Sequence, residues 1–113
     1  MDPEDRFDEL IAAMAGLGAT PPAGGRRFHS PALRYEGRVI AMLAGRGLAV
    51  KLPRDLVDEL VTRGYGEHFT DLRGAPMREW FVLAPDSDVP WLELAKEALA
   101  YAQRAQIGRS PTS

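Results

Sequence analysis

The chain contains no cysteine, and this absence removes several classes of chemistry. Without cysteine there is no disulfide framework, no thiolate nucleophile and no zinc site built on sulfur ligands. Histidine is almost as scarce: only His29 and His68 occur, and their separation does not match the spacing of local zinc motifs. The sequence therefore predicts neither a metal centre nor another bound cofactor.

Long apolar segments are also missing. No run approaches the roughly 20 residues that a membrane-spanning helix needs. Residues 1–25 carry five acids and one base, whereas a secretory signal begins with basic residues. We therefore expect a protein without membrane association, located in the cytoplasm.

The sequence lacks the local motifs of hydrolases and nucleotide-binding enzymes. There is no G-x-S-x-G turn, and Ser30 directly follows His29, which places the two side chains on opposite faces of a strand. Gly45-Arg46-Gly47 precedes a predicted strand, whereas a phosphate-binding loop leads into a helix. The pattern favours a non-enzymatic protein, with a small enzyme as an alternative.

What is present is the composition of an ordinary globular domain, with 45% hydrophobic and 27% charged residues among 113. This length supports one domain with a single buried core. We assign residues 1–107 to that domain and residues 108–113 to a disordered C-terminal tail. The segment from Ala19 to Gly25 is rich in proline, glycine and alanine, so we expect a loop within the domain.

Three segments have the apolar spacing of amphipathic helices. The first begins near Asp2-Pro3 and ends at Gly16 or Gly18, the second follows Pro53 and ends at Arg63-Gly64, and the third follows the Pro85–Pro90 loop. Ser87 or Asp88 in that loop is available to cap the third helix. The apolar stripes are Phe7, Leu10, Ile11, Met14 and Leu17, then Leu56, Val57, Leu60 and Val61, then Trp91, Leu94, Ala95, Ala98, Leu99 and Ala102.

Strands account for most of the remaining chain. Residues Phe28 to Leu52 predict three strands joined by tight turns, of which Glu36-Gly37 is a two-residue hairpin turn. The length of the second turn, around Gly45, is not decided by the sequence: loops of two, four or five residues all fit, and each gives a different strand register. After the second helix, His68 to Leu72 predicts a short edge strand, and Met77 to Leu83 predicts another strand. Because tight turns require antiparallel neighbours, the sequence predicts a two-layer α+β fold: an antiparallel sheet of four to five strands with helices on one face, in the order α-β-β-β-α-β-β-α.

A basic segment lies within a chain whose net charge is −2. Residues 26–54 contain seven basic residues and one acid, whereas residues 55–93 contain nine acids and three bases. Basic side chains along a strand can contact nucleic-acid phosphates without reading the sequence. The candidate residues for binding nucleic acid or a protein partner are Arg34, Arg38, Arg46, Lys51, Arg54 and Arg78.

Ordinary surface ion pairs are the competing interpretation of these cations. The expected pairs join Lys51, Arg73 and Arg78 to Glu59, Asp71 and Glu79 or to neighbouring acids. In this interpretation the basic and acidic segments compensate each other in the fold, and the charge pattern reports no partner.

Two further features concern packing. A strand set rich in alanine (Ala32, Ala41, Ala49) can leave one sheet face thinly covered, which favours assembly as a homodimer. Trp80 and Trp91 both fall in regular elements, so we expect them to pack rather than to serve as ligand platforms.

Short motifs follow one another between Phe28 and Ala102: Tyr35-Glu36-Gly37-Arg38-Val39-Ile40-Ala41, Gly47-Leu48-Ala49-Val50-Lys51-Leu52, a helix ending at Gly64, Phe69, and Pro76-Met77-Arg78-Glu79-Trp80. Their order resembles the TfoX N-terminal domain family and the related MmcQ/YjbR-like proteins. The resemblance implies the same α+β fold and a regulatory or interaction role, with competence regulation and DNA binding as the associated functions. It implies no catalytic residues, because the family has none established. TfoX itself carries a second, C-terminal domain that 113 residues do not accommodate, which argues against a competence role.

Overall fold

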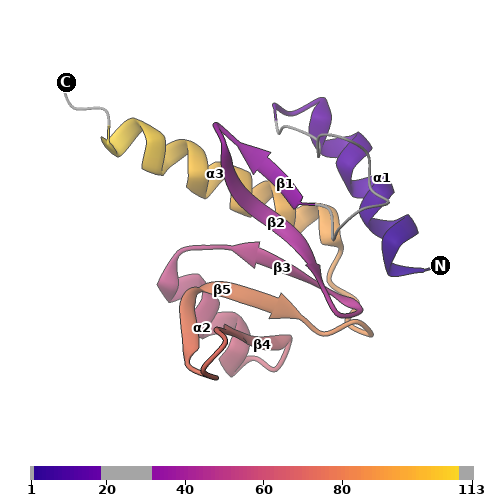
Figure 1. The fold of residues 1–113 in the computed structure, drawn as a ribbon, viewed down its shortest axis with the longest axis vertical. Helices are drawn as coiled ribbons and strands as arrows, with labels where there is room; N and C mark the ends of the chain where they lie inside the picture. The colour runs from indigo at the N-terminus through magenta and orange to yellow at the C-terminus, as the bar shows by residue number, and fades with distance from the viewer. Residues whose placement is uncertain (1, 19–31, 110–113) are drawn as a thin grey trace.

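The computed structural model describes residues 2–18 and 32–109. Its elements are α1 (Pro3–Ala15), β1 (Ala32–Tyr35), β2 (Arg38–Ala44), β3 (Gly47–Lys51), α2 (Arg54–Thr62), β4 (Gly66–Thr70), β5 (Pro76–Leu83) and α3 (Trp91–Arg109). This order confirms the predicted α+β class (Figure 1). The predicted Ala19–Gly25 loop, and the part of the first predicted strand that precedes Ala32, lie outside the described residues.

All five strands belong to one antiparallel sheet with the order β1-β2-β3-β5-β4. The first three strands are neighbours in sequence and in space, whereas β5 lies between β3 and β4. β4 is an edge strand, as the sequence predicts, but it spans Gly66–Thr70 rather than His68 to Leu72. Leu72 instead lies fully exposed in the turn between β4 and β5.

Two tight turns set the register of the first three strands. Glu36 and Gly37 both have positive φ angles, 52° and 82°. Two successive positive φ angles are typical of a type I′ turn, whose twist matches that of the strands on either side. In the second hairpin Ala44 lies opposite Gly47, so the turn contains only two residues, 45 and 46. The register that the sequence left open is therefore the one with the shortest loop.

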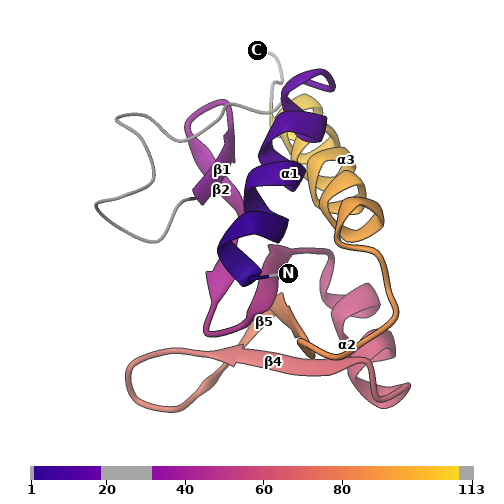
Figure 2. The same ribbon diagram turned by 90° about the vertical axis from the view of Figure 1, so that its right-hand side faces the viewer.

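The three helices pack on a single face of the sheet. α2 and α3 lie behind the strands in Figure 1 and to the right of them in Figure 2. The shared core contains Phe7, Leu10 and Met14 from α1, Val57 from α2, Trp91, Leu94, Ala95, Ala98 and Leu99 from α3, and Leu33, Ile40, Ala41, Leu48, Val50, Phe81 and Leu83 from the strands. The predicted helix stripes are therefore confirmed, except for Leu17, which follows the end of α1 and is 46% exposed.

The loop before α3 differs from the prediction. Because α3 begins at Trp91, neither Ser87 nor Asp88 is adjacent to its first turn, and the predicted cap is wrong. The Ser87 hydroxyl oxygen instead accepts the backbone N–H of Val89 at 3.2 Å, within the loop itself. At its other end α3 continues to Arg109, so residues 108 and 109 are helical, and residues 110–113 lie outside the described part of the chain.

β4 and β5 approach each other closely at Gly66. A Cβ atom there would collide with the carbonyl oxygen of Val82 and lie 2.8 Å from Cζ of Phe81. Because the Val82 carbonyl belongs to β5, which pairs with β4, it cannot move away without weakening the hydrogen bonds between these two strands. We expect Gly66→Ala to lower the free energy of unfolding by about 1–3 kcal/mol, measured by chemical denaturation.

Gly16→Ala is the matched control for this substitution. Gly16 has a right-handed φ of −70°, and the nearest atom to an added Cβ there is 3.8 Å away. We expect this variant to be as stable as the unchanged protein or slightly more stable. Equal losses of stability in the two variants would contradict the close approach at Gly66.

The indole of Trp91 joins α1 to the start of α3. Its side chain is 5% exposed, and its Nε1 has no hydrogen-bond partner among the residues that the structure describes. The Arg6 guanidinium carbon lies 4.1 Å from the ring centroid, in cation–π contact. Trp91→Phe keeps an aromatic ring and removes a buried donor that has no acceptor among the described residues, so we expect the free energy of unfolding to change by less than about 1.5 kcal/mol. Trp91→Ala should cost about 3–5 kcal/mol, and similar losses in the two variants would contradict this expectation.

Candidate nucleic-acid interface

The first half of β5 departs from regular pairing with β4. His68 lies opposite Phe81, but the next residue, Phe69, lies opposite Met77. Residues 78–80 therefore form a bulge with no partners on β4. On the other side of β5, Trp80 pairs with Lys51 at the end of β3, and the backbone carbonyl of Glu79 accepts the N–H of Leu52. Bulges of this kind redirect side chains locally and are common beside functional sites.

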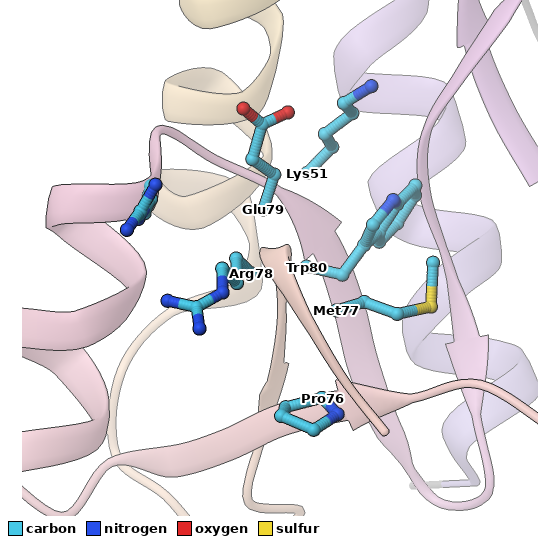
Figure 3. A pocket seen from close by; sticks show the side chains of 7 residues that line it. Lys51, Pro76, Met77, Arg78, Glu79 and Trp80 are labelled. Carbon is cyan, nitrogen blue, oxygen red and sulfur yellow. The ribbon is translucent and has the colours of Figure 1, made fainter. Parts of the chain in front are cut away.

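The bulge forms one wall of an open hollow with a volume of about 510 Å³ (Figure 3). Three segments meet around it: the end of β3, the start of α2 and the start of β5. The lining residues are Lys51, Arg54, Pro76, Met77, Arg78, Glu79 and Trp80, and we call this feature the basic hollow. Figure 3 shows Met77 and Trp80 pointing to one side of β5 and Arg78 to the other, which departs from the strict alternation of a regular strand.

The basic hollow brings together three of the six candidate cations. Lys51, Arg54 and Arg78 come from three different elements. Within residues 2–18 and 32–109, none of the three has a carboxylate oxygen within 4.0 Å. Glu79 is the one acid among the described lining residues. The hollow therefore carries positive charge that a single carboxylate offsets only in part.

Lys51, Arg73 and Arg78 form no ion pair with any acid in the described part of the chain, so the predicted pairs with Glu59, Asp71, Glu79 or neighbouring acids are wrong there. Glu59 pairs with Arg63 at 2.9 Å, one turn along α2. Asp71 accepts two backbone N–H groups of the β4–β5 turn, at 2.8 and 3.0 Å. The charge of Glu79 raises the pKa of the Tyr101 phenol. Arg63 and the turn amides thus engage Glu59 and Asp71, two of the three acids expected to pair with the basic set.

The other three candidates do not line the basic hollow. Arg34 and Arg38 flank the β1–β2 turn, which lies at the same end of the sheet as the basic hollow. Because β2 pairs with β3 only from Ala41 onward, this turn extends beyond the end of β3. Arg46 lies in the β2–β3 turn, at the opposite end of the sheet. The six residues therefore do not form one site.

An aromatic pair lies beside the cations. Trp80 is half-buried, and its ring contacts that of Phe69 edge to face, with 6.3 Å between centroids and an interplanar angle of 66°. Trp80 lies opposite Lys51 on β3, while the next residue, Phe81, belongs to the helix-facing core. Trp80 is therefore on the sheet face away from the helices. The predicted packing role is confirmed for Trp91, whereas Trp80 also lines the hollow.

Sequence reasoning did not select Met77, Glu79 or Trp80 as site residues. One signal was available for the last of them: Trp80 has the opposite strand parity to Phe81 and Leu83, so it cannot share their core face. No comparable signal marks Met77, because the bulge overrides alternation there.

Glu79 connects the basic hollow to α3. Burial raises the pKa of the Tyr101 phenol, and the charge and the hydrogen bond of Glu79 raise it further, while Arg104 partly lowers it. The pKa of Tyr101 therefore depends on the charge of Glu79.

The described segments contain no group of three or more histidine, aspartate or glutamate side chains that could hold a metal ion. His68 is engaged with Asp58, with 3.2 Å between Nε2 and Oδ1. A second hollow of about 570 Å³ lies where Arg6 of α1 covers Trp91 of α3, and the contact between the two helices forms its walls.

Comparison with known proteins gives no relative from which a function could be transferred. The chain matches no protein-family model, no curated protein and no solved structure. Among the helices that the structure describes, none is long and apolar enough to cross a membrane.

The contact between Glu79 and Tyr101 can be measured by titration. In a Tyr35→Phe/Tyr65→Phe background, Tyr101 is the remaining tyrosine, and its ionisation is followed by tyrosinate absorbance. We expect Glu79→Gln to lower the pKa of Tyr101, but not fully to its ordinary value, because burial persists. Glu67→Gln is the matched control on an exposed position of β4. An identical tyrosine titration with and without Glu79 would contradict the contact.

The same shift has a consequence for stability. The pKa of Tyr101 is higher in the folded chain than in the unfolded chain, so above the unfolded value the unfolded state binds fewer protons. The raised pKa therefore adds to the free energy of unfolding at neutral pH, where the Tyr101 phenol is protonated. This contribution is lost as the pH rises through the folded-state pKa of Tyr101. We expect this alkaline loss to be smaller in Glu79→Gln.

Proposed function

We propose that this chain is a TfoX-like, non-enzymatic interaction module that binds nucleic acid through the basic hollow. One observation carries the proposal: Lys51, Arg54 and Arg78 gather around one open depression without ion-pair partners in the described part of the chain. The resemblance of the sequence motifs to the TfoX N-terminal domain supports a regulatory role of the same kind. A cytoplasmic location is part of this proposal.

Phosphate groups suit this arrangement of cations. Arginine offers a planar fork of donors that matches phosphate oxygens, and lysine adds a compact point charge. The neighbouring surface of α2 is acidic and exposed at Asp55, Asp58 and Glu59. Those carboxylates repel a polyanion and restrict it to the basic end of the sheet, where Arg34 and Arg38 extend the positive surface. The expected binding is therefore local, weak and sensitive to salt.

A homodimer is the second candidate, favoured by the sheet face away from the helices. Met42 and Val82 are partly exposed on this face, on either side of the buried Ala49. Ala41, which the sequence placed with Ala49, lies in the helix-facing core instead. Light scattering over a range of protein concentrations tests this alternative, and a monomer at every concentration would count against it.

We expect fluorescence-anisotropy titrations to detect binding of oligonucleotides at low salt. If the three hollow cations each contact a phosphate, the logarithm of the association constant should fall with the logarithm of salt concentration with a slope of about −2 for single strands. Replacing Lys51, Arg54 or Arg78 by glutamine should weaken binding by about two- to five-fold in each variant, because each variant loses one exposed contact between a cation and a phosphate. Each replacement should also make the salt dependence shallower by about 0.7.

Arg46→Gln is the matched control, because it removes the same charge at the far end of the sheet. We expect nearly unchanged affinity in this variant. Thermal unfolding of all four variants checks that the hollow substitutions leave the fold intact. Two results would defeat the proposal: no binding of single or double strands at low salt, or equal weakening by Arg46→Gln and Arg78→Gln.

A further inference from the structure

The basic hollow opens beside the sheet face that the helices leave uncovered. The core residues of α1, α2 and α3 meet the strands from the opposite side, as Figure 2 shows for α2 and α3. Trp80 and Phe69 lie at the basic end of this uncovered face, and neither belongs to the helix-facing core. Both rings are half-buried rather than enclosed. An aromatic surface therefore meets the Lys51 ammonium, which has no ion-pair partner in the described part of the chain.

The aromatic pair holds the indole in a defined orientation. The edge-to-face contact with Phe69 fixes the ring plane of Trp80 from one strand, and the pairing with Lys51 fixes its backbone from another. A ring that is already ordered loses little further freedom when a flat ligand stacks on it. At the same position Lys51 approaches from the neighbouring strand, so a charge lies next to a stacking surface.

A site that binds only phosphate does not require an aromatic ring beside a cation, as Trp80 lies beside Lys51. In a duplex, the flat faces of the bases are stacked on one another and are not available to a protein side chain. In a single strand the bases are free to stack on aromatic rings while cations follow the backbone. The hollow volume of about 510 Å³ also falls within the range of roughly 300–1,000 Å³ of pockets that hold small ligands, which admits one nucleotide unit.

We infer that the ligand of this site is single-stranded nucleic acid, with one base stacked on Trp80, the adjoining phosphate held by Lys51, and a phosphate further along the strand held by Arg78 on the other side of β5. The inference rests on the proposed function and narrows it to one class of nucleic acid. Arg54, at the start of α2, extends the phosphate contacts beyond the stacked base.

The two tryptophans of the chain make the test direct. In a Trp91→Phe variant, Trp80 is the remaining fluorophore. We expect a short oligo(dT) strand to quench its fluorescence during binding, because a stacked base contacts the indole. A duplex of the same length and a base-free inorganic polyphosphate are the comparison ligands, and both should bind more weakly and leave the fluorescence nearly unchanged.

Substitutions of Trp80 in the otherwise unchanged protein provide the second measurement. Trp80→Leu should lower the affinity for oligo(dT) by about 5- to 150-fold, the range that stacking of one base contributes, and should leave polyphosphate binding unchanged. Trp80→Phe retains a ring and should recover most of that affinity. Trp91→Phe, which changes a buried tryptophan outside the hollow, is the matched control. Circular dichroism establishes that each variant is folded, and if Trp80→Leu does not fold, Trp80→Phe and the quenching experiment decide.

The outcomes separate this inference from the proposed function. Equal affinity for single strand and duplex without quenching would overturn the stacking model while leaving phosphate binding at the hollow in place. If polyphosphate binds as tightly as oligo(dT), the stacking model is likewise overturned, and phosphate binding at the hollow remains in place. Absence of binding to every ligand at low salt would overturn both.

Discussion

The pairing of β3 with β5 is the interaction on which the rest of the structure depends. It joins the early hairpins to the later β4–β5 pair and so makes one sheet from segments distant in sequence. Under this pairing, Val50 and Phe81 lie side by side in the core beneath the helices. At the end of the same ladder, Lys51 lies opposite Trp80. One set of backbone hydrogen bonds therefore organises both the core and the candidate interface.

The two halves of β5 have different roles. Its second half pairs regularly with strands on both sides and buries Phe81 and Leu83. Its first half bulges away from β4, so the side chains of residues 78–80 depart from regular alternation and line the hollow between the end of β3 and the start of α2. A regular strand would alternate these side chains between core and solvent. The irregularity is what allows cations and an aromatic ring to surround a single depression, while the regular half keeps that depression on a rigid support.

Much of the fold could be predicted because its determinants are local. The helix stripes and the Glu36-Gly37 turn are set by nearest neighbours, and each gave the correct element. The interface could not be predicted in the same way. Lys51 and Trp80 become neighbours only through the insertion of β5 between β3 and β4, and the bulge leaves no mark in the apolar pattern. Arg46 was grouped with Lys51 because the two are close in sequence, yet a two-residue turn places them at opposite ends of a strand.

The insertion of β5 also has a consequence for the order of folding events. The chain makes β3, α2 and β4 before it reaches β5, yet β3 and β4 are not neighbours in the finished sheet. Until β5 enters, each of these strands presents an unpaired edge to solvent, and such edges recruit strands from other molecules. β4 gains its partner through the local β4–β5 hairpin, whereas the free edge of β3 is covered only by a contact between distant parts of the chain, which forms slowly compared with hairpins. The edge of β3 that β5 covers is therefore the one open to other molecules until that distant contact forms.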